Sequence, residues 1–421
     1  MARVVMKFGG TSVANLDCIR NASKHVKREF ESGNEVAVVV SAMSGTTNQL
    51  VEWVRDLSTL YDAREYDTVV ASGEQITAGL LAITLQSMNI QARSWQGWQI
   101  PVKTNRAHGA ARILDVNGEE IRKRLKLPEV AIVTGFQGIE PKSNRITTLG
   151  RGGSDTSAVA LAIAVEADVC DIYTDVDGIY TTDPRIEPKA QRMSRVSYEE
   201  MLEMASLGSK VLQTRSVELA MIHSMRVRVL SSFSEPDSIP SVMRVHDWDK
   251  IGTIVCGEDE IVEAQIVSGI AYAKDEAKVT VQQIADQPGI AASIFGPLAE
   301  ANINVDMIVQ NLSSDGKSTD MTFTVTANEL NRTRQVLEDA RQHIGYSNII
   351  SSDDVVKVSV IGIGMRSHPG VAAQMFTELA EKHINILAIT TSEIKISILI
   401  RSEYAELAVR TLHSLYGLDK D

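Results

Sequence analysis

The run Val4-Val5-Met6-Lys7-Phe8-Gly9-Gly10-Thr11-Ser12 opens the chain with a short apolar strand that delivers one cation, two adjacent glycines and two hydroxyls to the same point. Adjacent glycines let backbone amides approach a ligand closely, and an ammonium group beside them favours an anion. The stretch therefore predicts a site for a polyphosphate, and hence for a nucleotide. Taken by itself, the hexapeptide from Lys7 also fits a turn that joins a strand to a capped helix.

Beyond this stretch, short β-branched runs alternate with longer helical segments as far as about residue 245. The predicted buried strands are Val36–Val40, Val130–Thr134, Val169–Thr174 and Val227–Leu230. The predicted helices between them include Thr46–Leu60, Gly73–Met88 and Thr156–Glu166. This alternation predicts an α/β fold, a helix-covered and mainly parallel sheet with its ligands at the loops beyond the strand ends. A stretch of prolines and small polar residues at 234–240 predicts a domain boundary.

The rest of the chain contains an internal duplication. Pro288-Gly289 and Pro369-Gly370 lie 81 residues apart, and the same offset aligns further identical residues. They are Ala291/Ala372, Ala292/Ala373, Phe295/Phe376, Leu298/Leu379, Ala299/Ala380, Glu300/Glu381, Ile303/Ile384 and Asn304/Asn385. Each copy reads as a strand, a Pro-Gly loop, an amphipathic helix and a second strand, which predicts two related α+β units.

A second glycine-rich stretch, Thr147-Thr148-Leu149-Gly150-Arg151-Gly152-Gly153-Ser154-Asp155, runs into a predicted helix with Ser154 and Asp155 at N-cap positions. Free amides and the dipole at a helix start favour an anion, and the planar guanidinium of Arg151 suits a carboxylate or phosphate. Two such sites in one sheet domain indicate two anionic ligands. A flexible turn followed by a capped helix is the structural alternative.

The segment from Tyr173 to Arg185 follows a predicted strand and carries several carboxylates and turn-forming residues. Such a loop suits the adenosine part of a nucleotide or a magnesium ion, although acidic turns are often simply solvated.

Composition narrows the class of protein. The chain has 421 residues, 44% of them hydrophobic, and 42 basic against 54 acidic side chains give a net charge of −12. This balance argues against nucleic acid or an anionic membrane as partner and favours a small-molecule ligand. The three cysteines, Cys18, Cys170 and Cys256, and the eight histidines form no metal-like spacing. Without a signal-like start or a long apolar run, we expect a cytoplasmic protein.

Taken together, these motifs resemble those of the aspartate kinases, in the amino-acid kinase superfamily. The resemblance rests on the Lys7 stretch, Ser41-Ala42-Met43-Ser44-Gly45-Thr46-Thr47-Asn48, Ser72-Gly73-Glu74, the Arg151 loop and the Tyr173 segment. It covers essentially the whole chain, because the duplicated tail resembles the paired ACT units of that family. It implies an amino-acid kinase catalytic domain at residues 1–245, a first ACT unit at 264–345 and a second at 353–421.

The resemblance also implies ATP-dependent phosphorylation of the L-aspartate side-chain carboxylate to 4-phospho-L-aspartate, with Mg²⁺, towards lysine, threonine and methionine. Its implied catalytic residues are Lys7, Gly9, Gly10, Gly153 and Asp155, with Lys7 on the transferring phosphoryl group and the glycines donating amides. Its implied substrate-binding residues are Ser41, Thr47, Glu74, Arg151 and Ser154. Its implied ATP-binding residues, besides Lys7, Gly9 and Gly10, are Thr174, Asp175, Tyr180, Arg185 and Lys210. It implies no dedicated metal site in the protein.

For the tail, the resemblance implies feedback inhibition by lysine and/or threonine at ACT units that pair between chains, which makes a homo-oligomer. The implied inhibitor sites comprise Asp286, Gly289, Gln310, Asn385 and Ile386, with Ser392 and Glu393 in another. Two alternatives stay open: another kinase of the superfamily, and a non-catalytic amino-acid sensor. The sequence also leaves open which amino acids inhibit the enzyme and whether they act jointly, and whether the oligomer is a dimer or a tetramer. It does not show whether an internal start yields a separate regulatory subunit, or whether each ACT unit is contiguous in the sequence.

Overall fold

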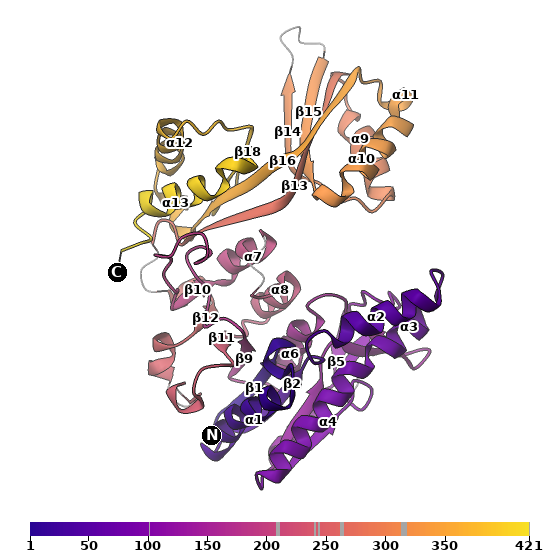
Figure 1. Cartoon of the computed structure of the whole chain (residues 1–421), viewed down its shortest axis with the longest axis vertical. Coiled ribbons are helices and arrows are strands. Elements are labelled where there is room, and N and C mark those ends of the chain that lie inside the picture. The colour runs from indigo at the N-terminus through magenta and orange to yellow at the C-terminus, as the bar shows by residue number, and fades with distance from the viewer. Residues whose placement is uncertain are drawn as a thin grey trace. The chain divides into compact units, whose positions relative to one another are not determined.

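The computed structural model describes residues 1–100, 102–207, 211–239, 241–242, 245–261, 265–312 and 318–420, without the side chains of 245–247 and Ser367. The chain forms two compact units. The first comprises Met1–Ile179 and Arg192–Val262, and the second Tyr180–Gln191 and Glu263–Asp421. Figure 1 shows the helices and strands of each unit.

The first unit is built on an eight-stranded, mainly parallel sheet in the order β10-β12-β11-β9-β1-β2-β6-β3. Its strands are β1 (Arg3–Phe8), β2 (Glu35–Val40), β3 (Ala92–Trp95), β6 (Val130–Thr134), β9 (Val169–Thr174), β10 (Arg195–Ser197), β11 (Val227–Ser231) and β12 (Thr253–Cys256). All neighbours from β11 to β3 are parallel, and β12 is antiparallel to β11. The predicted strands and the parallel sheet are thus confirmed. Because β12 belongs to this sheet, the unit continues past the predicted boundary at 245.

Helices cover both faces of this sheet. The helices of the unit are α1 (Leu16–Glu31), α2 (Thr46–Leu57), α3 (Ala63–Val70), α4 (Ser72–Ser87), α5 (Glu119–Leu125), α6 (Gly153–Ala164), α7 (Tyr198–Ser206) and α8 (Thr214–Ile222). On one face, α1 and α4 bury Ile19, Val26 and Leu81 against alternate strand residues such as Met6 and Val38. This alternation of buried residues between two faces is what the apolar runs predict.

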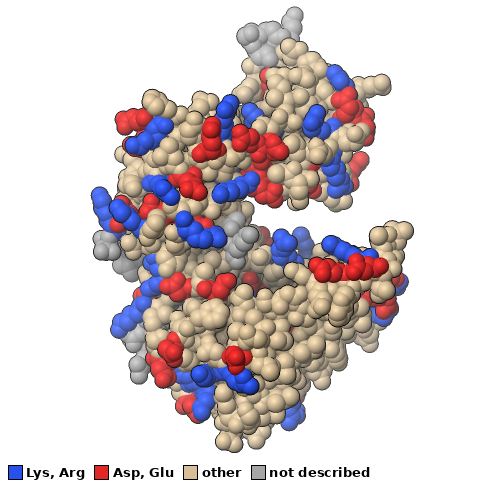
Figure 2. Space-filling view, in the orientation of Figure 1, with Lys and Arg blue, Asp and Glu red and all other residues tan. Residues whose placement is uncertain are grey.

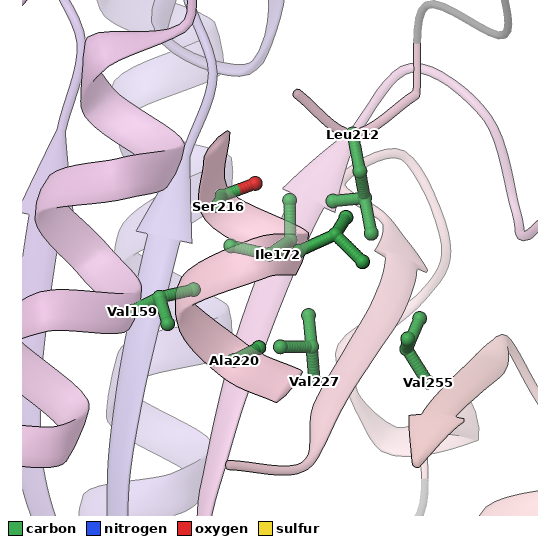
Figure 3. A pocket seen from close by; sticks show the side chains of 8 residues that line it. Val159, Ile172, Leu212, Ser216, Ala220, Val227 and Val255 are labelled. Carbon is green, nitrogen blue, oxygen red and sulfur yellow. The ribbon is translucent and has the colours of Figure 1, made fainter. Parts of the chain in front are cut away.

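On the other face, α6 and α8 pack against β9, β11 and β12. In Figure 3, Val159 and Ala220 point from these helices towards Ile172, Val227 and Val255 of the strands. The space among these side chains does not admit a water molecule. We therefore read this contact as core packing rather than a ligand site.

Helices α3 and α4 follow each other closely, and the stretch Ala63–Ser87 is long and apolar enough to cross a membrane by length and composition alone. Half of its most apolar window is buried, and α4 supplies Ala78, Leu81 and Leu85 to the core. These contacts are those of a core helix. Its other face exposes Ile76 and Ile83, and Figure 2 shows few charged side chains over this part of the unit.

A small four-stranded sheet, β5-β4-β7-β8, completes the first unit. Its strands are β4 (Val102–Thr104), β5 (Ile113–Val116), β7 (Gln137–Glu140) and β8 (Arg145–Thr148). The last residue of β8 leads directly into the loop that carries Arg151.

The second unit contains a six-stranded sheet in the order β14-β15-β13-β16-β18-β17. Its strands are β13 (Gly269–Ala285), β14 (Asp306–Leu312), β15 (Ser318–Val325), β16 (Asn348–Ile361), β17 (Ala388–Thr391) and β18 (Lys395–Arg401). Its helices are α9 (Ile290–Glu300), α10 (Leu330–Asp339), α11 (Arg341–Ile344), α12 (Val371–Glu381) and α13 (Ala405–Leu415).

The predicted duplication has a matching structural repeat. Gly289 and Gly370 precede α9 and α12 with φ angles of +94° and +106°, and Asn302 and His383 end those helices with φ of 54° and 57°. These left-handed positions recur at the 81-residue offset, as do buried residues of the two cores, such as Leu298 and Leu379. The two α+β repeats within the second unit therefore follow the same backbone path.

Each repeat has its own hydrophobic core, the first around Leu298 and the second around Leu379. The long strands β13 and β16 contribute residues to both cores. Ile270, near the start of β13, packs in the second core, whereas Val279, further along it, packs in the first. The register of β13 with β16 shifts between Ala273 and Lys278, where the strand passes from one core to the other. The predicted ranges 264–345 and 353–421 do not follow this division, because each core takes a strand from outside its range.

A short segment from the middle of the chain, Tyr180–Gln191, also belongs to the second unit. Ile186 packs in the second core, and its carbonyl accepts a hydrogen bond from Arg410 Nε at 2.8 Å. Thr181 Oγ1 lies 2.9 Å from Nε2 of the buried His413, and the Thr181 carbonyl accepts the Ile270 amide. These contacts fix the segment to β13 and α13.

Candidate active site

The candidate site lies where the neighbouring parallel strands β9, β1, β2 and β6 end. The loops that follow them are residues 175–179, 9–12, 41–45 and 135–136. In parallel sheets with helices on both faces, ligands bind at this carboxyl edge. The topology thus brings together the Lys7, Ser41 and Tyr173 motifs, although Tyr173 lies more than 100 residues along the chain from the other two.

Lys7 lies next to the end of β1, where it pairs with Val39 of β2 and Ile172 of β9. It is only 8% exposed, and its Nζ lies 2.6 Å from Oδ1 of Asp155, in the first turn of α6. Separating a buried pair leaves uncompensated charges, which is energetically costly. The two groups therefore stay in contact. The pair sets an ammonium group at the edge of the sheet.

The glycine loop after Lys7 is fastened to the end of β9. The Gly9 amide donates to the Tyr173 carbonyl at 3.2 Å, and the Ser12 hydroxyl donates to the same carbonyl at 3.3 Å. The rings of Phe8 and Tyr173 stack beneath the loop, 4.8 Å apart. A Cβ on Gly10 would lie 3.2 Å from the Ala42 carbonyl, so a glycine suits the close approach of the two loops.

The second glycine-rich loop turns into α6 at Gly153, three residues before the predicted helix start at Thr156. Gly152 is the N-cap, with φ of +72°, so Ser154 and Asp155 lie in the first turn instead of at the cap. A Cβ on Gly152 would meet the side chain of Gln213 at 1.8 Å, which no other residue type would tolerate without movement. The buried start of α6 faces Lys7 through Asp155, and a helix start favours negative charge.

Two of the predicted amide donors are already engaged. Gly9 donates to Tyr173, and the Gly153 amide donates to the Gly150 carbonyl at 3.0 Å. Because an amide has one hydrogen, either group would meet a phosphate only if its present bond opened or was shared. Among the described residues, the Gly10 amide has no such backbone acceptor, so it fits the predicted role best.

Glu74, in the first turn of α4, is 3% exposed. Its Oε1 accepts the Ala42 amide at 3.0 Å, whereas its Oε2 is buried without a hydrogen-bond partner among the described residues. Burial raises the pKa of this carboxyl from 4.5 to about 7, although the Ala42 amide partly opposes the shift. A buried oxygen left unpaired costs free energy, which a ligand with an ammonium group would recover.

The other predicted substrate residues lie in the loops after β2 and β8 and in the first turns of α2 and α6. Ser41 follows β2 and donates its amide to the Phe8 carbonyl at 3.1 Å, and Thr47 lies in the first turn of α2. Ser154 is buried in the first turn of α6. Arg151 is exposed, and it forms no ion pair or hydrogen bond with any residue that the structure describes.

The predicted nucleotide residues divide between the units. Thr174 ends β9, and its hydroxyl donates to Asp175 at 3.2 Å, at the same edge as Lys7. Tyr180 and Arg185 belong to the second unit, where Arg185 pairs with Asp183 at 2.7 Å. Lys210 lies outside the described residues.

The sequence reading missed Phe136, which follows β6 at this edge. Its φ is +67°, a conformation that is uncommon for a residue with a side chain, and its amide donates a hydrogen bond to the Ser157 hydroxyl oxygen at 3.0 Å. A Cβ on Gly153 would lie 3.0 Å from the Phe136 ring, so this residue borders the α6 start. The signal in the sequence was Gly135-Phe136 directly after the predicted strand Val130–Thr134.

The predicted regulatory residues lie mostly on exposed turns and edges of the second unit. Asp286 and Gly289 are in the exposed turn between β13 and α9, and Gln310 is exposed on the edge strand β14. Asn385 and Ile386 precede β17, and Ser392 donates its amide to the Lys395 carbonyl in the turn that follows β17. Glu393 pairs with Arg366 at 3.3 Å.

Comparison with known proteins agrees with this geometry. The amino acid kinase family model matches residues 2–231, and an ACT domain model matches 279–340 and 358–416. The aspartate kinase Ask_LysC of Stutzerimonas stutzeri is 48% identical over 420 residues, which cover 100% of this chain and 98% of that protein. The chain belongs to the aspartate kinase family. The fold expected from the resemblance, an amino-acid kinase domain followed by ACT units, is confirmed.

Two solved structures of this family match over almost their whole length. Aspartokinase III of E. coli in complex with aspartate and ADP, in the R-state, superposes with a TM-score of 0.77 at 26% identity. The match covers 98% of this chain and 99% of that one. The same enzyme with lysine and aspartate, in the T-state, gives a TM-score of 0.75 at 26% identity, with the same coverage of 98% and 99%.

Proposed function

We propose that this aspartate kinase transfers the γ-phosphoryl group of ATP to the side-chain carboxylate of L-aspartate and releases ADP and 4-phospho-L-aspartate. The observation that carries the proposal is the buried, unpartnered Oε2 of Glu74 at the same sheet edge as Lys7. A buried carboxylate oxygen that lacks a partner suits the α-ammonium of an amino acid, and a buried ammonium suits a transferring phosphoryl group. The E. coli relative with bound aspartate and ADP supports the same pair of ligands.

The chemistry requires little of the protein beyond positioning and charge. A carboxylate oxygen of aspartate attacks the γ-phosphorus, a new oxygen–phosphorus bond forms, and the bond to the bridging oxygen of ADP breaks. The nucleophile is already ionised at neutral pH, so no general base is needed. Lys7 would stabilise the negative charge on the transferring group, and Arg151 would fix a carboxylate of the substrate.

Magnesium fits this site as a partner of the nucleotide. Among the described residues, no group of three His, Cys, Asp or Glu side chains is placed to hold a metal ion. Mg²⁺ prefers one or two carboxylates together with substrate phosphates, and Asp155 and Asp175 are carboxylates of this edge that suit it. When bound, the ion would neutralise phosphate charge during transfer.

We also propose that lysine and/or threonine inhibit the enzyme through its ACT units, and that these units pair between two chains. The lysine-bound T-state of E. coli aspartokinase III supports the first point. Exposed apolar residues on the strands β14 and β17, Ile308, Leu312 and Ile389, support the second, because exposed apolar surface favours association with another chain.

A coupled assay of ADP release tests the reaction. We expect turnover with L-aspartate that depends on ATP and Mg²⁺, and none with L-glutamate or UMP at the same concentration. Turnover with another acceptor in preference to aspartate would reject the proposal, and the absence of turnover with every acceptor would favour a sensor. Adding lysine and threonine singly and together to the same assay tests the regulation.

A further inference from the structure

Asp67 of α3 is a carboxylate with no exposed surface. It accepts three hydrogen bonds, from the Thr148 hydroxyl at 2.6 Å, from His108 Nδ1 at 2.6 Å and from the Gly109 amide at 3.0 Å. An ionised carboxylate only accepts, so the direction of each bond is fixed. Such a charge is costly to bury, and its three donors compensate the cost only while all of them stay in place.

The three donors belong to the two segments that shape the Arg151 loop. Thr148 ends β8 and is followed by Leu149-Gly150-Arg151, and the Thr148 carbonyl accepts the Ala111 amide at 2.9 Å. Gly150, with φ of +77°, approaches the Gly109 carbonyl so closely that a Cβ would lie 3.2 Å from it. Asp67 therefore joins segment 108–111 to segment 148–150.

Arg215 of α8 holds the same two segments through their backbone. Its Nη1 donates to the Leu149 carbonyl at 2.7 Å and its Nη2 to the Ala111 carbonyl at 3.0 Å. The loop before Arg151 is thus fixed by side chains of two helices, although Arg151 itself is exposed.

We propose that Asp67 and His108 are positioning residues that set the Arg151 guanidinium for the substrate carboxylate. This inference rests on the proposed aspartate kinase reaction. A guanidinium binds a carboxylate through two parallel hydrogen bonds, which tolerate little misplacement. Neither Asp67 nor His108 touches the substrate. Both act through Thr148, Gly109 and the loop that these residues lead into.

Adjacent residues of β8 supply the matched test. Thr148→Val removes the hydroxyl that donates to Asp67, whereas Thr147→Val removes an equally buried hydroxyl that lies 2.6 Å from Thr104 Oγ1. We expect Thr148→Val to raise the KM for aspartate about five- to tenfold, with the KM for ATP and kcat within twofold of the parent. We expect Thr147→Val to leave all three within twofold.

His108 gives an independent arm, because asparagine can offer an amide donor where the imidazole has Nδ1–H. We expect His108→Ala to raise the aspartate KM as Thr148→Val does, and His108→Asn to restore most of the loss. Thermal unfolding of every variant is measured alongside.

Equal effects of Thr148→Val and Thr147→Val, a parallel rise in both KM values, or a lower melting temperature with an unchanged aspartate KM would each overturn the inference. Activity of the parent enzyme distinguishes a failure of the proposed reaction from a failure of the proposed positioning role. If the parent shows no ADP release with aspartate, the proposed reaction is wrong. If the parent is active and Thr148→Val behaves like Thr147→Val, only the positioning role is wrong.

Discussion

The ammonium group of Lys7 lies 2.6 Å from the carboxylate of Asp155, and this ion pair joins the end of the central strand β1 to the first turn of α6. Both residues are less than a tenth exposed. The pair places one positive charge at the edge where four parallel strands end, which is where a transferring phosphoryl group would need it.

We predict that Lys7→Ala folds but loses about 10²–10³-fold in kcat, because one preorganised charge on the transferring group is lost. Steady-state kinetics of ADP release measures the loss, and circular dichroism checks the fold. Lys103→Ala is the control, since Lys103 pairs with Asp115 at 2.8 Å on the exposed small sheet of the same unit. A Lys7→Ala enzyme within about threefold of the parent would remove the lysine from the reaction.

Glu74 predicts a pH dependence for aspartate binding. Since burial raises its pKa to about 7, the carboxyl is largely protonated below that pH and ionised above it. An α-ammonium binds the ionised form, so kcat/KM for aspartate should rise between pH 6 and pH 8. In Glu74→Gln this rise should disappear, and the value should stay low throughout.

The same group has an opposite effect on the unliganded protein. Its folded pKa is higher than its unfolded value of 4.5, so its contribution to stability is complete below pH 4.5 and is lost as the pH rises to about 7. Thermal unfolding of parent and Glu74→Gln across this range separates the two effects. If kcat/KM for aspartate changes with pH in the same way in the parent and in Glu74→Gln, a group other than Glu74 titrates.

Arg151→Ala should raise the KM for aspartate far more than the KM for ATP. Losing one partner of a desolvated charge pair costs about 2–5 kcal/mol, which corresponds to about 30-fold or more in affinity. Arg151→Lys should recover only part of the loss, because an ammonium cannot bind a carboxylate through two parallel bonds. If the KM for ATP rises and the KM for aspartate does not, Arg151 binds the nucleotide instead of aspartate.

The sheet and the main motifs were predictable because the signals are local. Apolar runs such as Val130–Thr134 can only be buried strands in this context, and Lys7 with its two glycines follows such a run directly. The duplication was visible for the same reason, since identical turns need glycine at the same left-handed positions, Gly289 and Gly370.

What the sequence could not reveal depends on contacts between distant residues. Residues from Tyr173 to Arg185 read as one loop, but Ile186 packs with residues of α13 and so carries Tyr180 and Arg185 into the second unit. Likewise, β13 is one continuous strand, and nothing in its pattern shows that Ile270 and Val279 enter different cores. The buried Asp67 was missed because an isolated aspartate in a helix resembles a solvated one.

The last prediction concerns regulation. Glu393, in the turn between β17 and β18, is 81% exposed and pairs with Arg366 at 3.3 Å. If its carboxylate binds an inhibitor's ammonium group, Glu393→Ala should raise the concentration of lysine or threonine needed for half-inhibition. An inhibitor shifts the enzyme only by its preference for the inactive state, typically about 1–3 kcal/mol, so one lost charged contact would remove much of the effect.

Turnover without inhibitor should stay close to that of the parent, because Glu393 belongs to the second unit, outside the strand edge that carries Lys7 and Glu74. Ser392→Ala should weaken inhibition less, because the substitution keeps the hydrogen bond that the backbone amide of residue 392 donates to the Lys395 carbonyl. Glu378→Ala, which removes a carboxylate paired with Lys382 on α12, is the control for charge alone. Inhibition curves of Glu393→Ala that coincide with those of Glu378→Ala and the parent would exclude Glu393 from the inhibitor site. A parent that responds to neither amino acid would reject lysine and threonine as its inhibitors.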